Sequence, residues 1–177
     1  MRITIGGPPG SGTTTVAQKV AAEFGLTHIY AGKIFRDMAA ERGISLGDFG
    51  LLAERDDKFD REVDKRLHDM AVEDTITEGR MAAFVVSSPD LTIWIDAPLD
   101  VRVSRIARRE PYTEQQIREM TLEREESEKQ RYSAYYGVNI YALSHYDIVI
   151  NSEKWDSDGV FAIVKSAITS LARATQE

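Results

Sequence analysis

Short apolar runs alternate along this chain with longer segments in which apolar residues recur every three or four positions. The short runs predict buried strands at residues 2–6, 27–30, 75–77, 91–96 and 148–150. The periodic segments between them predict helices, because residues spaced in this way share one helix face. Strands that alternate with helices are typical of parallel sheets, so we expect an α/β fold with a five-stranded parallel sheet and helices on both faces.

The connection between the second and third strands contains three helical segments, although an ordinary crossover needs only one. The first begins at Ala31 and ends at Gly43, the second follows a capping-box pair formed by Ser45 and Asp48, and the third covers residues 57–73. These segments predict a helical insertion over the carboxyl ends of the strands, which is where ligands bind in open α/β sheets.

Proline, glycine and hydroxyl residues mark the helix limits elsewhere in the chain. Gly25 is expected to end a helix over residues 13–24, and residues 81–88 suit either a short helix or a strand. The remaining expected limits are Pro98 and Arg109 for one helix, Thr113 and Tyr136 for a long polar helix, and Ser157 as the cap of the last helix.

Composition restricts the class of protein further. The 177 residues suit a single domain, and a hydrophobic content of 42% is enough for a core. Apolar runs stay well below the roughly 18 residues of a membrane span. The N-terminus reads as a strand without a signal-peptide pattern, so we expect a cytoplasmic protein that does not bind membranes.

Cysteine, histidine and charge narrow the candidate chemistry. The chain has no cysteine, which excludes disulfides and thiolate metal sites. His28, His68 and His145 lack ligand spacing and are expected at the surface or in packing. The net charge of −7, from 29 acidic and 22 basic residues, argues against nucleic acid as a partner. We expect a monomer.

A glycine-rich segment joins the first strand to the first helix. It consists of Gly7, Pro8, Pro9, Gly10, Ser11, Gly12, Thr13, Thr14 and Thr15. Glycines allow backbone N–H groups to turn towards a phosphate, and the helix N-terminus adds a partial positive charge. The strand–loop–helix context therefore predicts a phosphate-binding loop rather than a loop shaped only by packing.

One position departs from the phosphate-loop consensus, in which a lysine precedes the Ser or Thr that binds Mg2+. Thr13 stands at the lysine position, whereas Thr14 supplies the expected hydroxyl. Another cation must then neutralise the β- and γ-phosphates, and arginines are the candidates.

Two arginines follow the ends of predicted strands. Arg36 lies one turn into the helix after the second strand, and Arg80 follows the third strand. Phosphoryl transfer depends on positioned substrates and on cations around the moving group. Loops at strand ends favour function, so these two arginines fit that need better than a solvated surface role.

A second group of arginines flanks the expected break between the helix ending near Arg109 and the next one. Arg102, Arg105 and Arg109 share one helix face, and Arg124 and Arg131 share a face of the returning helix. The break suggests a mobile flap. Spacing alone does not separate a phosphate clamp from solvated arginines that pair with nearby glutamates.

An acidic residue near Mg2+ is also expected. Glu78 ends the third strand and Asp96 ends the fourth, so both qualify by position. Asp96 closes a run that reads like a Walker B strand, but it could instead cap the helix that follows.

Several segments together resemble the nucleoside monophosphate kinases. They are Gly7–Gly12, Ala31–Arg36, Glu78–Arg80 and the stretch from Arg131 to Asn151, which contains Tyr-Tyr-Gly and Tyr-Asp-Ile-Val-Ile-Asn. Within that family the chain is most similar to the archaeal type of cytidylate kinase. The resemblance covers nearly the whole chain, and the order of the segments is more specific than any one motif.

The resemblance implies one P-loop kinase domain, residues 1–177, that transfers a phosphoryl group from ATP to CMP or dCMP with Mg2+. It implies an acceptor-binding helical part at about residues 33–73 and a short lid at about residues 105–113. The base-reading residues are not indicated by the motifs.

The resemblance also implies roles for individual residues. Residues 7–15 would bind ATP, and Thr14 would bind Mg2+ with indirect help from Glu78, where related kinases have the shorter Asp. By position, Arg36 and Arg80 would hold the acceptor phosphate. The transferring group would be clamped by Arg105, Arg109 and Arg131.

Two other interpretations fit parts of the sequence. One is another small-molecule kinase, of the adenylate or shikimate type, although adenylate kinases typically have Asp-Gly-Phe-Pro-Arg where this chain has Glu78–Ala82. The other is a nucleotide-binding regulator without catalysis, which the missing lysine motivates. Turnover that depends on an acceptor would distinguish the two classes.

Overall fold

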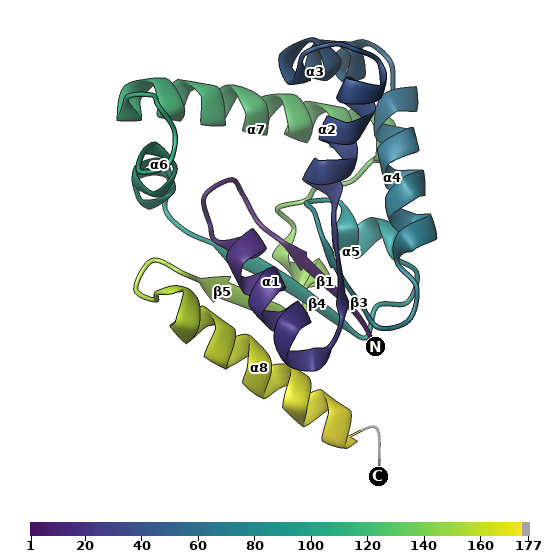
Figure 1. Cartoon of the computed structure of the whole chain (residues 1–177), viewed down its shortest axis with the longest axis vertical. Helices are drawn as coiled ribbons and strands as arrows, with labels where there is room; N and C mark the ends of the chain where they lie inside the picture. The colour runs from purple at the N-terminus through teal and green to yellow at the C-terminus, as the bar shows by residue number, and fades with distance from the viewer. Residues whose placement is uncertain (175–177) are drawn as a thin grey trace.

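A five-stranded parallel sheet forms the centre of the computed structural model, which describes residues 1–174 (Figure 1). The strands lie in the order β2-β3-β1-β4-β5. Their bounds are β1 (Arg2–Gly6), β2 (Thr27–Tyr30), β3 (Thr75–Glu78), β4 (Leu91–Asp96) and β5 (Ile148–Asn151). The expected five-stranded parallel sheet is confirmed, and each strand lies within one residue of its predicted limits.

Helices connect the strands and cover both faces of the sheet. Their bounds are α1 (Thr13–Phe24), α2 (Ala31–Glu41), α3 (Leu46–Arg55), α4 (Lys58–Met70), α5 (Ala82–Val85), α6 (Leu99–Ala107), α7 (Glu114–Tyr136) and α8 (Ser157–Ala174), with a 3-10 turn at Leu143–His145. None of the helices within residues 1–174 is long and apolar enough to cross a membrane.

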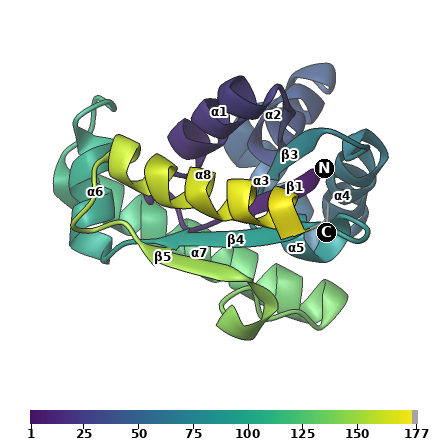
Figure 2. The same cartoon turned by 90° about the horizontal axis from the view of Figure 1, so that it is seen from below.

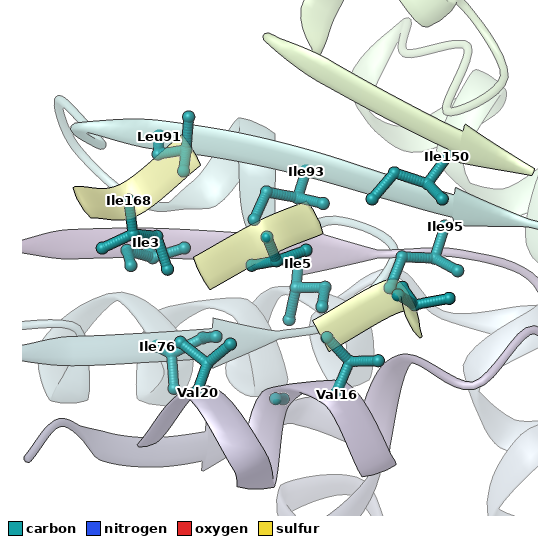
Figure 3. Close-up of a cluster of buried hydrophobic side chains, with 13 residues drawn as sticks. Ile3, Ile5, Val16, Val20, Ile76, Leu91, Ile93, Ile95, Ile150 and Ile168 are labelled. Atoms are coloured by element: carbon teal, nitrogen blue, oxygen red, sulfur yellow. The ribbon is translucent and has the colours of Figure 1, made fainter. Parts of the chain in front are cut away.

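The main core lies between the sheet and the two helices α1 and α8, which run side by side on one face (Figure 2). Apolar side chains from alternate strand positions, such as Ile3, Ile5 and Ile93, meet Val16 of α1 and Ile168 of α8 (Figure 3). These five side chains are at most 1% exposed. This packing makes the sheet and α1 a rigid support for the loop between β1 and α1.

The helices inserted between β2 and β3 have a smaller core of their own. Phe49 of α3 is fully buried, and its ring contacts Phe35 of α2 and Phe59 of α4 edge to face. Ile29 of β2 and Ala82 of α5 complete this cluster against the sheet. The insertion therefore packs as a separate layer over the strand ends, as the three helical segments predicted (Figure 1).

Three helix limits differ from the prediction, one of which is the end of α4 at Met70 and not at residue 73. The helix after β4 ends at Ala107, so Arg109 lies in the turn beyond it. The cap of α8 is Asp156, whose Oδ1 accepts from the Gly159 N–H at 2.8 Å, whereas Ser157 is the first helical residue. Of the two structures that suited residues 81–88, the short helix is the one observed, as the single turn α5 at Ala82–Val85.

The sheet register brings the candidate residues to one edge. Glu78, the last residue of β3, lies beside Ile5 of β1 and beside Tyr30 of β2. Gly6 of β1 lies beside Trp94 near the end of β4. The phosphate-loop candidate, Glu78 and the start of α2 therefore meet at the carboxyl edge of the sheet.

Candidate active site

The glycine-rich segment forms a tight turn between β1 and α1. Gly10 and Gly12 have φ values of 83° and 103°, which favour glycine. A Cβ at Gly7 would lie 2.1 Å from the Ile95 carbonyl oxygen, so this position admits no side chain. The first turn of α1 contains no acidic side chain, and Gly12 is its N-cap. The helix N-terminus is therefore open to an anion.

Two arginines of α6 donate hydrogen bonds to backbone carbonyls of this turn. Arg102 donates from Nη1 to the Pro9 carbonyl at 3.1 Å and pairs with Glu125 of α7 at 2.6 Å. Arg105 donates to the Ser152 carbonyl at 2.7 Å, and its Nη1 lies 3.4 Å from the Ser11 carbonyl oxygen. Arg105, predicted to clamp the transferring group, thus contacts the backbone of the loop in this structure.

Glu78 forms the centre of a buried cluster beneath the loop. Its side chain is 4% exposed. Oε1 accepts from the Thr14 hydroxyl at 2.6 Å and from the Thr13 hydroxyl at 3.0 Å. Oε2 lies 2.9 Å from Nε2 of His28 on β2. Threonine at the usual lysine position therefore has a definite contact, because its hydroxyl helps to hold a buried carboxylate.

His28 is a site residue that the sequence analysis assigned to the surface or to packing. The residue sits two positions before Tyr30 on β2, so both side chains lie on the same face of the sheet. Their rings are 6.2 Å apart and nearly parallel. The alternation of side chains along β2 could have indicated that His28 faces the site. That inference requires knowing that β2 lies beside β3, the strand that ends in Glu78.

Asp96 has a more local role than that of Glu78. Its Oδ1 accepts from the N–H of Ala97 at 2.8 Å, and its carbonyl accepts from the N–H of Ser152 at 2.8 Å. Helix α6 begins three residues after Asp96, at Leu99, and its N-cap is Pro98, so Asp96 shapes the strand end and does not cap the helix. Of the two acids predicted near Mg2+, Glu78 accepts from hydroxyls of the phosphate loop, and Asp96 has no such contact within residues 1–174.

Arg36 lines a cavity of about 580 Å³ together with Thr14 and His28. Its guanidinium lies over the ring of Tyr30, 5.1 Å from the centroid. The other basic side chains around this cavity pair with acids, Lys33 with Asp37 and Arg66 with Glu41. Arg36 and the phosphate loop thus share one cavity, as their positions after β1 and β2 predicted.

Arg80 and Arg131 lie instead in buried ion pairs with acids that the sequence analysis did not single out. Arg80 pairs with Glu128 of α7, and both side chains are 8% exposed. Arg131 donates from Nη1 to both carboxylate oxygens of Asp60 on α4, each at 2.6 Å. Arg80 Nη1 and Arg131 Nε have no hydrogen-bond partner within residues 1–174.

At both Glu128 and Asp60, burial raises the pKa of the carboxyl group and the neighbouring arginines lower it. Burial alone would raise the pKa of Glu128, but Arg80 and Arg124 outweigh it, and the pKa is lowered. At Asp60 burial prevails over Arg131, and the pKa is raised. Arg80 and Arg131 thus each have a carboxylate partner and a buried guanidinium nitrogen without a hydrogen-bond partner in the described part of the chain.

Arg109 is exposed in the turn between α6 and α7. Residues 108–113 are all exposed, and Thr113 begins α7 with a capping box to Gln116. Helix α7 then crosses over the strand ends towards α3 and α4 (Figure 1). The structure thus places Arg36 near the loop, Arg105 behind it, Arg80 under α7, Arg131 on the inner face of α7, and Arg109 in solvent.

Comparison with known proteins gives a consistent family. Residues 2–154 match the model of the cytidylate kinase-like family. The chain is 48% identical to the cytidylate kinase of Methanopyrus kandleri, with 96% of this chain and 93% of the relative aligned. It is 48% identical to the cytidylate kinase of Pyrococcus horikoshii, with 96% of this chain and 88% of the relative aligned. It is 46% identical to the cytidylate kinase of Methanocaldococcus jannaschii, with 98% of this chain and 100% of the relative aligned.

Solved structures agree on the fold. A shikimate kinase from Bacteroides thetaiotaomicron superposes with a TM-score of 0.59 at 15% identity, over 96% of this chain and 98% of that one. An uncharacterised protein from Eubacterium ventriosum gives a TM-score of 0.71 at 21% identity, over 95% and 98%. These likenesses establish the fold, whereas the sequence matches establish that this chain belongs to the cytidylate kinase-like family.

Proposed function

We propose that this protein is a cytidylate kinase, which transfers the γ-phosphoryl group of Mg2+-ATP to CMP or dCMP and yields ADP with CDP or dCDP. The observation that carries the proposal is the contact of Glu78 with both threonines of a phosphate loop, in a chain that belongs to this family. That contact puts a carboxylate and a hydroxyl side by side where a nucleotide-bound cation is needed.

The loop of residues 7–15 would bind the phosphates of ATP. Its backbone N–H groups and the open N-terminus of α1 supply the partial positive charge. The closely packed glycines fix the turn before the nucleotide arrives. Binding therefore requires little rearrangement of the backbone, and the phosphates gain a fixed orientation.

The oxygen atoms at the loop fit Mg2+. Thr14 would bind the ion directly and Glu78 would act through a water molecule, since Mg2+ prefers oxygen ligands and retains several waters. Bound there, Mg2+ would neutralise charge on the phosphates of ATP. Thr13 and His28 would keep the Glu78 carboxylate oriented toward that position.

The acceptor phosphate would lie between Arg36, which shares a cavity with Thr14, and Arg80, which has a buried nitrogen without a hydrogen-bond partner within residues 1–174. Arg131, whose Nε also lacks a partner there, would contact the transferring group. The helical part at about residues 33–73 would bind the acceptor, in line with its separate core. Bidentate arginine contacts suit this task, because a phosphate presents several acceptor oxygens.

The segment at about residues 105–113 would act as the lid. Arg109 would swing inward from its exposed position and supply the charge that lysine provides in other phosphate loops. Arg105 would join it only by exchanging its present carbonyl partners. Closure would also exclude water, which protects the phosphoryl group from hydrolysis.

A panel of acceptors tests the proposal. ADP formation from Mg2+-ATP is measured with CMP, dCMP, UMP, AMP and shikimate at equal concentrations. We expect CMP or dCMP to give the highest kcat/KM, and turnover to require an acceptor. Preference for AMP or shikimate would favour another small-molecule kinase, and ATP binding without acceptor-dependent turnover would favour a regulator.

A further inference from the structure

Arg102 is a buried arginine of α6 whose guanidinium contacts three different parts of the fold. Its side chain is 7% exposed. Nε donates to the Ala97 carbonyl at 2.9 Å, and Nη1 donates to the Pro9 carbonyl at 3.1 Å and to Glu125 at 2.6 Å. This one side chain therefore joins the segment after β4, the phosphate loop and helix α7, although the proposed reaction gives it no role.

The backbone of α6 lies directly against the phosphate loop at the same place. A Cβ at Gly10 would lie 2.7 Å from the Arg102 carbonyl oxygen and 3.0 Å from the Arg102 Cβ. The loop therefore has no room to move closer to α6. The packing at Gly10 and the hydrogen bond to the Pro9 carbonyl thus restrict the same peptide group, which joins these two loop residues.

The orientation of this peptide group determines where its N–H points. In a trans peptide, as here, the carbonyl and the N–H of the next residue point in opposite directions. Because the Pro9 carbonyl points to the guanidinium, the Gly10 N–H points away from α6. The Ser11 carbonyl accepts from the Ser152 hydroxyl at 2.9 Å, which turns the Gly12 N–H away from Ser152 in the same manner.

Both of these glycine N–H groups are available to an anion. The N–H groups of Gly10 and Gly12 donate to no protein atom within residues 1–174, whereas the Ser11 N–H between them donates to the Pro8 carbonyl at 3.2 Å. The open N-terminus of α1 begins at the same place, so a phosphate oxygen is a suitable acceptor. The inference below rests on the proposed function, in which this loop binds the phosphates of ATP.

We infer that Arg102 is a positioning residue for ATP, because its hold on the Pro9 carbonyl keeps the Gly10 N–H directed at the nucleotide phosphates. The guanidinium lies on the opposite side of the peptide group from that N–H, so it does not itself contact the phosphates. Glu125 neutralises its charge. The contribution of Arg102 is therefore the orientation of the backbone, and it does not replace the positive charge of the missing lysine.

Replacing Arg102 with methionine tests this role, because it removes the hydrogen bonds and retains an unbranched side chain. The substitution is combined with Glu125→Gln, since a buried carboxylate without its arginine would destabilise the fold. Calorimetry gives the dissociation constants of ADP, without Mg2+, and of CMP for Glu125→Gln and for the double variant. We expect ADP to bind roughly 10- to 100-fold more weakly to the double variant, and CMP to bind equally to both, because only hydrogen bonds to the ATP-site phosphates are affected.

Steady-state kinetics separate this role from a loss of folded protein. The KM for ATP should rise in the double variant while the KM for CMP stays the same, whereas a smaller folded fraction would lower the apparent kcat and leave both KM values unchanged. Arg118→Met is the matched control. Arg118 also joins α6 and α7, through an ion pair with Asp100, and has no contact with the loop within residues 1–174, so its KM for ATP should not change.

Two results would overturn the assignment of Arg102. One is equal binding of ADP to Glu125→Gln and to the double variant. The other is equal weakening of ADP and CMP, which would mean that the substitution disturbs the whole site. Failure of the proposed function is a different outcome, because the natural protein would then bind no ADP or would phosphorylate neither CMP nor dCMP.

Discussion

At the scale of single residues, the contacts of Glu78 show what Thr13 does at the position where phosphate loops usually carry lysine. Two threonine hydroxyls and a histidine ring surround one buried carboxylate, so the charge is held by hydrogen bonds from three directions. A glutamate side chain is longer than aspartate and has more rotamers to restrict. We therefore expect His28 to be a positioning residue for Glu78.

Replacing His28 with leucine removes one of these three contacts and preserves the apolar bulk on β2. We expect kcat to fall by roughly 10- to 100-fold, as for other residues that orient a group near a metal. Calorimetry should show weaker binding of Mg2+-ADP but unchanged binding of ADP without Mg2+. Gln18→Ala is the control, because Gln18 lines the same cavity and is exposed.

Equal weakening of ADP with and without Mg2+ would contradict this positioning role. A double-mutant cycle with Glu78→Gln adds a second check. If His28 acts through Glu78, its substitution should have little further effect once the carboxylate is gone. Full additivity of the two substitutions would show that His28 acts elsewhere.

Asp64 should reduce the stability of the folded protein at neutral pH. Burial raises its pKa from 3.8 to about 6, so folding favours the protonated form. The ionised form opposes folding above about pH 6, and this effect disappears below pH 3.8, where Asp64 is protonated in both states. Asp60 and Arg61 on α4, and Arg131 and Tyr136 on α7, face this carboxyl group.

Asp64→Asn should therefore stabilise the protein at pH 7 to 8 by on the order of 1 to 2 kcal/mol, a value reduced because Asp64 is partly exposed. Urea unfolding at several pH values measures the difference, with Asp69→Asn as the control. The gain should vanish as the pH falls towards 4. A gain that persists at low pH would mean that repacking, and not ionisation, causes it.

At the scale of elements, α7 is the helix whose packing apolar periodicity could not predict. The strands and most helices follow from apolar periodicity, because their inner faces contact apolar partners. The inner face of α7 instead carries Glu125, Glu128 and Arg131, each of which pairs with an oppositely charged residue on another element. Periodicity therefore predicted only a long polar helix, with no indication of what it covers.

Some residues of the site were likewise predictable from the sequence and others were not. The phosphate loop and the arginines after β2 and β3 were predictable, because strand-end positions in a parallel sheet share one edge. Their partners His28, Asp60 and Glu128 were not, because each pair depends on strand order or on helices that meet across the fold. The helix caps were predicted in part. Thr113 was correctly predicted as the cap of α7, whereas the cap of α8 was predicted at Ser157, one residue after the actual cap Asp156.

The Glu128–Arg80 pair should contribute strongly to the attachment of α7. Glu128→Gln leaves the buried Arg80 guanidinium without its counter-charge, so we expect a loss of about 3 kcal/mol in the free energy of unfolding. Glu126→Gln is the control, since Glu126 is exposed and lies 3.8 Å from Lys129. Chemical denaturation of both variants measures the difference, and equal stability of the two would contradict the role of the pair.

At the scale of the whole molecule, the charges of the proposed site are divided between buried and exposed positions. Arg80 lies under α7 and Arg131 lies on the inner face of that helix, both in ion pairs, whereas Arg109 is in the exposed turn between α6 and α7. Catalytic charge would thus be assembled only when both substrates are present and the lid moves. This arrangement would discourage hydrolysis of ATP in the absence of an acceptor.

Limited proteolysis with trypsin can detect this closure, because Arg108 and Arg109 are exposed in a turn outside the helices. We expect cleavage there in the free protein and strong protection by a bisubstrate analogue that joins adenosine and cytidine through a phosphate chain. Arg109→Ala retains the Arg108 cleavage site but removes the contact that would hold the lid closed. Its protection by the analogue should therefore be weaker, whereas equal protection of both proteins would mean that Arg109 does not reach the phosphates.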